Sequence, residues 1–301
     1  MSASDHPAVA RLCEQELTLD RDAANVLSVV LQRPVIGMVA ERGSRLIGAC
    51  IGSVGERGGP MVSGPASPPG DLLDGYLDLL VVDRDEQGQG TGRRLVSAVE
   101  QELAARGCGR IRVGGHSPWY AWPGIDVRYT PAVCFAEGLG YRRGSCEVDM
   151  QVDLATAPLD TTAGVQRLRA VGIVVRRAGP ADDGPLQDAL AGPWPTTWAT
   201  EVGAALRRPD GGVHIAQQNS RYVAFCAYGV NRPHEIGPIG TDPGLRHLGI
   251  GAIVLRHCLS EQRDRGLAIA DIGWVGPVAF FSRAVAATIS RAFWCYAKEI
   301  S

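Results

Sequence analysis

Two segments of the chain combine residue types and a spacing that suit the binding of a phosphate group. One spans residues 87–92 and reads QGQGTG, and the other spans residues 246–251 and reads RHLGIG, so both follow the pattern Q/R-x-x-G-x-G. Glycines allow the backbone to approach an anion closely, and the first amide groups of a following helix present a partial positive charge to it. The sequence therefore predicts two cradles for an anionic ligand. Neither segment fits the dinucleotide fingerprint or the P-loop pattern.

Each glycine segment lies between a predicted strand and a predicted amphipathic helix. The strands cover residues 77–82 and 235–240, and the helices end near residues 106 and 265. The two segments start 159 residues apart, at positions 87 and 246. The distance to a later glycine is also similar, since Gly115 follows Gly92 by 23 residues and Gly273 follows Gly251 by 22. This repeated order indicates a duplicated α/β fold.

We expect two tandem domains, residues 1–156 and residues 173–301. Residues 157–172 form the predicted linker, in which Pro158 and Gly164 favour an irregular backbone. A length of 301 residues allows two hydrophobic cores of ordinary size. The composition, 45% hydrophobic and 21% charged residues, is typical of a globular protein.

Bulk properties narrow the classes of function. A formal net charge of −2 provides no basic field that would concentrate nucleic acid or an acidic membrane. No apolar stretch approaches the roughly 20 residues that span a bilayer, and the N-terminus lacks the features of a signal peptide. The eight cysteines include no C-x-x-C pair, so neither a zinc site nor a disulfide scaffold is expected. We expect a cytoplasmic monomer or homodimer without a metal that acts on small molecules.

The first half carries an aromatic insert that the second half lacks. Phe135 lies 20 residues after Gly115, whereas Phe280 lies seven residues after Gly273, which leaves about 13 extra residues around HSPWYAWPGIDVRY. Such a segment either forms a substrate or partner surface or packs against the other domain.

Both halves resemble the GNAT superfamily of acyl-CoA-dependent N-acyltransferases, in which Q/R-x-x-G-x-G/A follows the fourth strand. The resemblance rests on VVDRDEQGQGTGRRLVSAVEQELAARG with CFAEGLGYRR in the first half, and on GTDPGLRHLGIGAIVLRHCLSEQRDRG with VAFFSRAVAA in the second. It implies that each domain is a mixed central sheet flanked by helices. One pair of strands in each sheet would be splayed apart to admit the pantetheine arm of the cosubstrate.

The resemblance also implies which residues bind acetyl-CoA or another acyl-CoA. The loop amides would hold the diphosphate, and the strand backbone before each loop would pair with pantetheine and polarise the thioester carbonyl. The implied residues are Val81, Val82, Gln87, Gly88, Gly90, Thr91, Gly92, Ile239, Gly240, Arg246, Leu248, Gly249 and Gly251. Arg93, Arg94 and Arg256 on the helices either add phosphate contacts or remain solvated charges.

An amine attacks a thioester only when it is neutral, so the site needs a group that removes a proton. Polar side chains near the strand ends that border the slot are the candidates. They are Asp78 and His116 in the first half, and His234, Glu235 and Asp271 in the second. We favour the second half as the catalytic one, because Glu235 lies on the loop-bearing strand and the compact turn over residues 274–277 leaves the slot open.

The family often supplies a tyrosine acid directly after a phenylalanine on the next helix, and this chain lacks it twice. Phe135 is followed by Ala136, and Phe280 is followed by Phe281. Tyr129 or Tyr296 would replace the acid, or the thiolate, with a pKa near 8.5, would leave without help. A third possibility is that one half or both halves bind the cosubstrate without turnover.

The predicted function is transfer of an acyl group from acyl-CoA to an amine of a small metabolite, for example in specialised metabolism or in antibiotic biosynthesis or modification. A phosphopantetheinyl acyl carrier protein is an alternative donor and partner. Two other functions stay open, a non-catalytic CoA-binding or scaffold protein and a protein N-acetyltransferase.

Overall fold

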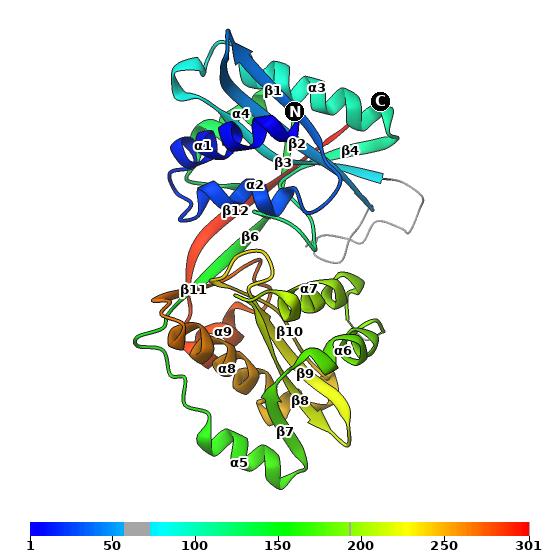
Figure 1. Ribbon diagram of the computed structural model, residues 1–301, viewed down its shortest axis with the longest axis vertical. Helices are drawn as coiled ribbons and strands as arrows, with labels where there is room; N and C mark the ends of the chain where they lie inside the picture. Colours follow the sequence, from blue (N-terminus) through cyan, green and yellow to red (C-terminus); the bar gives the residue numbers. More distant parts are fainter. Residues whose placement is uncertain (57–72, 193, 301) are drawn as a thin grey trace. The chain divides into compact units, whose positions relative to one another are not determined.

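The chain forms two compact units, each built around a β-sheet (Figure 1). The structure is a computed structural model that describes residues 1–56, 73–192 and 194–300. Unit 1 comprises Met1–Glu147 together with Ala292–Ser301, and unit 2 comprises Val148–Arg291.

The borders of these units differ from the predicted domain borders at residues 156 and 173. The predicted linker, residues 157–172, belongs to unit 2 and contains a helix, α5 (Thr162–Ala170). Residues 292–301, which the sequence assigned to the second domain, belong to unit 1. Each unit is therefore completed by a segment that the linear order of the repeats places in the other half.

The sheet of unit 1 is mixed, with the strand order β1-β2-β3-β4-β12. Among the described strands of this sheet, β3 and β4 are the pair that runs parallel, and α3 connects them, because parallel neighbours need a crossover segment. A short strand, β5, pairs with β12. The elements are α1 (His6–Glu16), α2 (Val26–Val30), β1 (Ile36–Arg42), β2 (Arg45–Glu56), β3 (Leu73–Val82), α3 (Thr91–Ala105), β4 (Cys108–Val113), β5 (Ile125–Asp126), α4 (Thr130–Gly138) and β12 (Thr288–Glu299), the last entering unit 1 at residue 292.

The sheet of unit 2 repeats this plan, with the strand order β6-β11-β10-β9-β8-β7. Here β10 and β11 are the parallel pair, and α8 connects them. The mixed α/β architecture predicted for both halves is confirmed. The elements besides α5 are β6 (Arg142–Asp153), β7 (Ile173–Arg177), α6 (Asp183–Leu190), α7 (Thr196–Arg207), β8 (Gly212–Gln218), β9 (Arg221–Tyr228), β10 (Glu235–Thr241), α8 (Ile250–Asp264), β11 (Ile269–Ile272) and α9 (Val278–Val285), with β6 entering unit 2 at residue 148.

The hydrophobic cores follow from amphipathic patterns on the helices. In unit 1, α3 and α4 bury one side of the sheet, and α1 and α2 bury the other. In unit 2, α8 buries apolar residues at helical spacing, including Ile250, Val254 and Cys258. The helix that follows each glycine segment is thus fixed to its sheet along one face.

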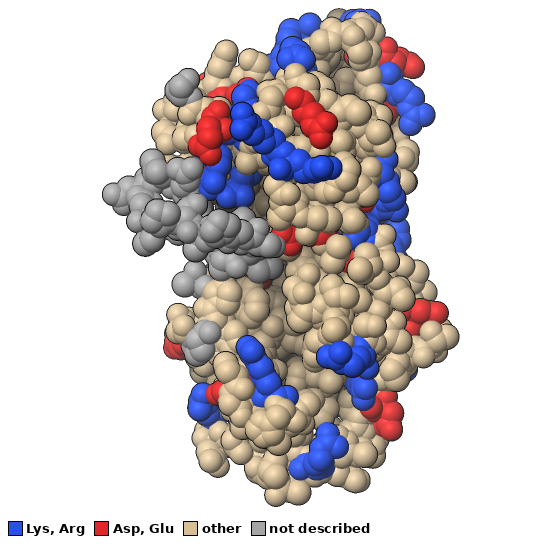
Figure 2. Space-filling view, turned by 180° about the vertical axis from the view of Figure 1, so that it is seen from behind, with Lys and Arg blue, Asp and Glu red and all other residues tan. Residues whose placement is uncertain are grey.

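On one face of unit 2, the basic side chains do not form a continuous patch (Figure 2). On the face shown in Figure 2, the Lys and Arg side chains of this unit form separate patches among uncharged surface. A phosphate-binding role on this face would therefore depend on individual arginines and not on a continuous basic surface.

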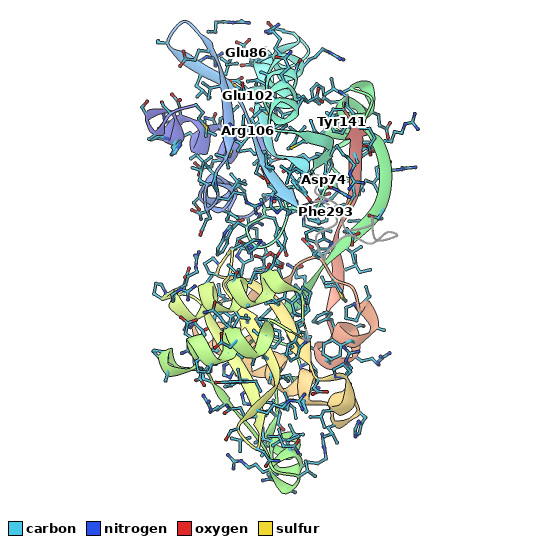
Figure 3. All side chains as sticks on the ribbon, turned by 90° about the vertical axis from the view of Figure 1, so that its right-hand side faces the viewer. Asp74, Glu86, Glu102, Arg106, Tyr141 and Phe293 are labelled. Carbon is cyan, nitrogen blue, oxygen red and sulfur yellow. The ribbon has the colours of Figure 1, made fainter. Side chains whose placement is uncertain are left out.

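A buried ion pair joins the two parallel strands of unit 1. Asp74 on β3, labelled in Figure 3, is fully buried and accepts hydrogen bonds from Arg110 Nε at 3.0 Å and Nη2 at 2.7 Å. Arg112 Nε donates to the same carboxylate at 2.9 Å. Both arginines lie on β4, so this charge cluster holds β3 and β4 together before they separate.

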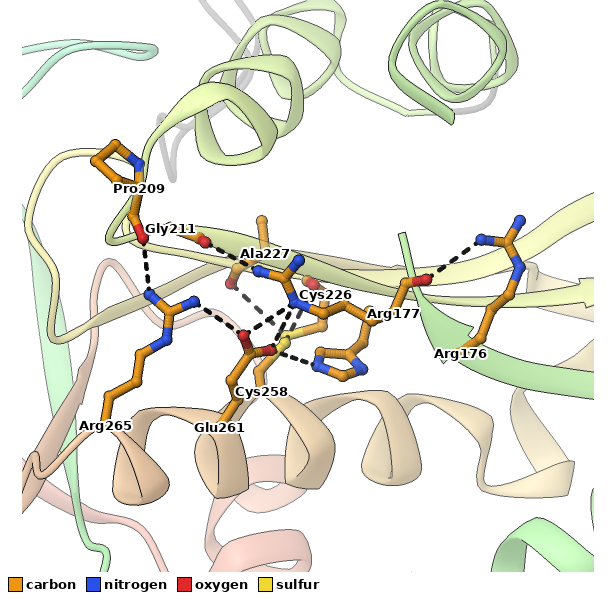
Figure 4. Close-up of polar contacts among 10 residues, drawn as sticks. Arg176, Arg177, Pro209, Gly211, Cys226, Ala227, Cys258, Glu261 and Arg265 are labelled. Atoms are coloured by element: carbon orange, nitrogen blue, oxygen red, sulfur yellow. Dashed lines mark hydrogen bonds and ion pairs between the residues drawn. The ribbon is translucent and has the colours of Figure 1, made fainter. Parts of the chain in front are cut away.

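A polar network anchors α8 to the sheet of unit 2 (Figure 4). Glu261 accepts hydrogen bonds from Arg177 Nε at 2.9 Å and Arg265 Nη2 at 3.0 Å, and its Oε2 lies 2.9 Å from His214 Nε2. Burial opposes ionisation, but the hydrogen bonds from Arg177 and His214 outweigh it and lower the pKa of Glu261 to about 2. The last turns of α8 are therefore tied to β7 and β8.

No helix among the described residues is long and apolar enough to cross a membrane. Over the same ranges, no group of three or more His, Cys, Asp and Glu side chains is arranged to hold a metal ion. All eight cysteines are free thiols.

Candidate functional site

The parallel strands separate at equivalent places in both units. Pairing between β3 and β4 ends at Leu77 and Val113, although β3 continues to Val82. Pairing between β10 and β11 ends at Ile236 and Ile272, although β10 continues to Thr241. Val81, Val82, Ile239 and Gly240, the predicted pantetheine-binding residues, all lie on the parted segments.

A β-bulge marks the point of separation in each unit. On β3, Leu77 and Leu79 pair with adjacent residues of β2, so Asp78 is the extra residue. Leu77 packs on the α3 side and Leu79 on the α1 side, whereas residues two apart in a regular strand share one face. On β10, Gly237 and Pro238 lie opposite one residue of β9. The extra residue increases the local twist, which turns each strand away from its parallel neighbour.

The turn after each parted strand is built in the same way. In unit 1, Asp83 Oδ1 accepts a hydrogen bond from the Asp85 amide at 3.0 Å, and Gln87 Nε2 donates to Val82 O at 2.9 Å. In unit 2, Asp242 Oδ1 accepts from the Gly244 amide at 2.9 Å, and Arg246 Nε lies 3.4 Å from Thr241 O. The first residue of the Q/R-x-x-G-x-G pattern thus ties the loop back to its strand.

The glycines of the two loops have distinct steric roles. Gly90 and Gly249 adopt left-handed conformations, with φ of 82° and 73°, directly before α3 and α8. A Cβ on Gly92 would lie 3.3 Å from Phe135, and a Cβ on Gly251 would lie 3.5 Å from Phe280. The first amides of both helices have no carbonyl partner within the helix, so each loop presents donors to an anion.

The structure brings the three candidate bases of unit 2 together where β10 and β11 part. Glu235 is the register partner of Asp271, and His234 Nε2 lies 3.4 Å from Asp271 Oδ2. A Cβ on Gly273 would lie 2.9 Å from Glu235 Oε1, so a side chain there would displace the Glu235 carboxylate.

Asp149 on β6 is a further acidic residue at this place that was not predicted from the sequence. Its Oδ1 accepts a hydrogen bond from the Trp274 amide at 2.8 Å, and burial raises its pKa to about 6. The predicted domain border assigned Asp149 to the first half. Pairing of β6 with β11, which no local pattern signals, places it in unit 2.

The two candidate bases of unit 1 also lie in one cluster. A Cβ on Gly115 would lie 3.3 Å from Asp78 Oδ1, and the neighbouring His116 has its Nε2 3.4 Å from Ser53 Oγ. The His116 ring packs on Tyr76 with a centroid distance of 4.2 Å.

The pKa values of His116 and Asp78 are shifted in opposite directions. Burial, with Arg33 nearby, lowers the pKa of His116 to about 3, so the ring is neutral and a weak base. Burial raises the pKa of Asp78 to about 7 despite the Arg33 charge. Among the described residues, both carboxylate oxygens of Asp78 are buried without a hydrogen-bond partner, and the residue is 3% exposed.

The aromatic insert packs on the N-terminal helices of its own unit. Trp122 Nε1 donates to Asp20 Oδ1 at 2.8 Å, and Tyr129 OH donates to Asp20 Oδ2 at 3.1 Å. Arg33 Nη2 donates to the carbonyl oxygens of His116 and Trp119. The insert therefore has a structural role within unit 1 that neither sequence interpretation included.

The two tyrosines considered as replacement acids are engaged elsewhere. Tyr296 lies in unit 1, where its hydroxyl donates to Glu137 Oε1 at 2.8 Å. Tyr129 is bound to Asp20 as described above. Neither contact places a hydroxyl on the parted strands.

The helix arginines also have different surroundings. Arg256 donates from Nε and Nη2 to Ala284 O at 3.0 and 2.8 Å, so it joins α8 to the end of α9. Arg93 Nη2 lies 3.5 Å from Gly138 O. Arg94 lies over its own loop, with Nη1 3.5 Å from Gln89 O.

Aromatic side chains that were not predicted from the sequence pack against β10 in unit 2, on the face opposite α8. Trp194 and Trp198 pack edge-on against Phe225, with centroid distances of 5.4 and 6.0 Å. A Cβ on Gly240 would lie 2.5 Å from Phe225 and 2.6 Å from Trp194 Nε1. The parted part of β10 thus runs between α8 and an aromatic wall.

Solved structures with the same fold include other proteins with GNAT domains. One is a fungal multi-domain GH3 β-N-acetylglucosaminidase with a GCN5-related glucosamine N-acetyltransferase region (TM-score 0.76, 19% identity); the match covers 98% of this chain but only 37% of that one. A GCN5-related N-acetyltransferase from Sphaerobacter thermophilus matches at TM-score 0.64 and 18% identity over 99% and 94% of the two chains. A tandem GNAT protein from the clavulanic acid biosynthesis pathway matches at 0.67 and 13% over 99% and 96%.

None of the curated proteins matches the sequence. At the identities given above, the solved structures show a common fold and nothing finer. The model of the acetyltransferase (GNAT) family, however, matches the sequence itself in two places, over residues 7–118 and 184–276. These matches include both glycine loops and together cover more than half of the chain. The chain therefore belongs to the acetyltransferase (GNAT) family.

Proposed function

We propose that this protein transfers an acyl group from acyl-CoA to an amine of a small metabolite. One observation carries the proposal: both units join a parted pair of parallel strands to an Asp-capped turn and to a helix that begins after a left-handed glycine. A diphosphate bound at the loop amides would direct the pantetheine arm along the parted strand edge. The thioester would then lie near the point where the strands separate, next to the candidate bases.

In the proposed reaction, the acceptor first binds as an ammonium ion and transfers one proton to Glu235. The neutral nitrogen attacks the thioester carbonyl carbon, the C–N bond forms and the C–S bond breaks. Coenzyme A leaves as a thiolate and, through water, takes up the second proton that the nitrogen loses as it becomes an amide, while Glu235 later releases its own proton to solvent. A thiol pKa near 8.5 makes this leaving group acceptable without a tyrosine acid.

Unit 2 is the proposed catalytic unit, because a general base must reach the proton that it removes. Glu235 is only half-buried and lies beside His234 and Asp271. Asp78 of unit 1 is covered by its own insert, with Tyr120 against Gly115. Unit 1 would then bind CoA and have a structural role, but it would not catalyse acyl transfer.

The aromatic wall of unit 2 favours an acceptor that has an apolar or sugar-ring face beside its amine. Glucosamine is a reasonable first acceptor, because the fungal protein with the same fold carries a glucosamine N-acetyltransferase region. Both loops are intact, which favours free acyl-CoA over a carrier-bound thioester as the donor. The cytoplasmic location and the monomeric or dimeric state stay predictions.

A second candidate function is CoA binding without catalysis. The positions after Phe135 and Phe280 hold Ala136 and Phe281, and both are buried in the cores. These residues supply no acid to either unit, which favours a sensor or scaffold. No observation favours a protein substrate.

The test uses the full chain with acetyl-CoA, propionyl-CoA and an acetylated acyl carrier protein as donors. The acceptors are amino sugars, amino acids and polyamines. We expect release of free thiol together with an acylated amine detected by mass spectrometry. Tight CoA binding without transfer from any donor would support the non-catalytic function. If the chain neither binds CoA nor transfers an acyl group, both the acyltransferase function and the non-catalytic CoA-binding function are ruled out.

A further inference from the structure

Each glycine loop has an arginine lying on it, but the two arginines come from different elements. In unit 1, a Cβ on Gly90 would lie 3.4 Å from Arg94 Nη1. Arg94 belongs to α3, the helix that the loop itself begins, and its Nη2 lies 3.3 Å from Thr91 Oγ1. The guanidinium therefore lies beside the left-handed glycine, at the donors that would meet an anion.

In unit 2, α8 carries no arginine at the equivalent position. The offset of 159 residues that relates Gly90 to Gly249 relates Arg94 to Ile253, which is 4% exposed and part of the core. A Cβ on Gly249 would nevertheless lie 3.9 Å from an arginine nitrogen, Nη2 of Arg167. Arg167 belongs to α5, in the segment that the sequence predicted as a linker.

The sequence of α5 explains how this arginine reaches the loop. Gly164, Arg167 and Leu168 are three and four residues apart and so share one face of the helix. A Cβ on Gly164 would lie 2.8 Å from Ile253 Cδ1, so the missing side chain allows α5 to lie close to α8. Leu168 is buried in the core of unit 2. The packing of α5 against α8 thus places Arg167 beside Gly249.

The guanidinium of Arg167 is available for a ligand. The side chain is exposed, and it takes part in no hydrogen bond or ion pair with any residue that the structure describes. Arg256, by contrast, donates three hydrogen bonds to backbone oxygens of Ala284 and Asp160. An arginine presents planar N–H donors that match phosphate oxygens in pairs.

We propose that Arg167 binds the diphosphate of coenzyme A at the loop of unit 2 and replaces there the arginine that unit 1 carries on α3. The inference rests on the proposed CoA-binding function and assigns to the predicted linker a part in it. Because Arg167 would act on ligand charge and not on the thioester, it would favour CoA over pantetheine derivatives without a diphosphate.

The experiment measures CoA and pantetheine binding to the full chain by calorimetry and native mass spectrometry. The variants are Arg167→Ala, Arg94→Ala and Arg169→Ala. Arg169 is the matched control, because it is an exposed arginine in the same last turn of α5. We expect Arg167→Ala to weaken CoA binding at one of two sites about tenfold, in line with loss of a charged hydrogen bond, and Arg94→Ala to weaken it at the other. Pantetheine binding should not change.

Three results would overturn the inference. One is equal CoA binding by Arg167→Ala and Arg169→Ala, and another is an equal loss of pantetheine and CoA binding. A wild-type chain that binds no CoA would overturn both this inference and the proposed function, so the two failures are distinguishable. Arg167→Gln keeps most of the side-chain length and the helix propensity, so it controls for destabilisation of α5. It should reproduce the loss of CoA binding.

Discussion

Glu235 Oε1 lies 2.9 Å from the point at which a side chain on Gly273 would begin. The same relationship holds in unit 1, where Asp78 Oδ1 lies 3.3 Å from that point on Gly115. Both glycines follow the second strand of the parted pair. Asp78 is the bulge residue of unit 1, whereas Glu235 lies two residues before the bulge of unit 2, so the two carboxylates come from positions two residues apart in the repeat. A carboxylate beside a bare backbone at the parting strands is thus common to both copies.

Glu235→Gln tests which of these carboxylates takes the proton. We expect kcat for acyl transfer to fall about 100-fold, as for loss of a general base, while KM for acetyl-CoA stays within twofold. Steady-state kinetics at several pH values would measure this. The matched variant Asp78→Asn should retain most activity; a large loss in Asp78→Asn and none in Glu235→Gln would transfer catalysis to unit 1.

Asp78 should make stability depend on pH. Its pKa is about 7 in the folded chain against 3.8 for a free side chain, so the folded state binds the extra proton between these values. The free energy of unfolding should therefore fall as pH rises from 4 to 7, by up to ~4 kcal/mol from this group. Urea unfolding of the wild type and Asp78→Asn at pH 5 and pH 8 checks the sign, since the variant should lose less stability. Parallel behaviour of the two proteins would contradict the burial of an unpartnered carboxylate.

Gly249→Val should remove CoA from unit 2, because a β-branched residue disfavours φ of 73° and its side chain would shield the loop amides. Gly90→Val should do the same in unit 1. Native mass spectrometry should then count one bound CoA in place of two. Gly266→Val is the matched control: its φ is 88°, so the strain of ~1–2 kcal/mol is similar, but it lies at the other end of α8. If Gly266→Val also loses CoA, strain and not the loop explains the effect.

Asp74→Asn should destabilise unit 1 by about 3 kcal/mol. The change removes the charge that Arg110 and Arg112 share and leaves both guanidinium groups without their buried partner. Chemical unfolding followed by circular dichroism would report the loss. Glu102→Gln on α3 removes an exposed carboxylate from the same unit and should change stability by less than about 0.5 kcal/mol (Figure 3).

Local patterns explain why the repeated fold and both loops were predictable. The glycine segments, the apolar runs before them and the helical periodicity after them all act over a few turns of chain. The candidate bases could be named for a similar reason, since Asp78 and Glu235 lie on the strands that carry the loops.

The domain borders and several site residues depend on contacts that are distant in the sequence. β6 pairs with β11, and β12 pairs with β4, so Asp149 and Tyr296 lie in units that their positions along the chain do not indicate. The period-two pattern of a strand indicates which face is buried, but it does not identify the distant strand with which it pairs. Arg167 was missed because Pro158 and Gly164 made its segment resemble a linker, whereas Gly164 serves to bring α5 against α8.

Unit 1 is built from two separate stretches of the sequence, so its sheet cannot be completed during translation until residues 292–301 have been synthesised. The edge of β4 can pair with β12 only after residues 296–299 have been synthesised, which follows the synthesis of all of unit 2. Until then, the nascent first unit exposes an open strand edge, which is the kind of surface that other chains can join. A chain that lacks the residues from 292 onward would therefore leave the edge of β4 open to pairing with other chains.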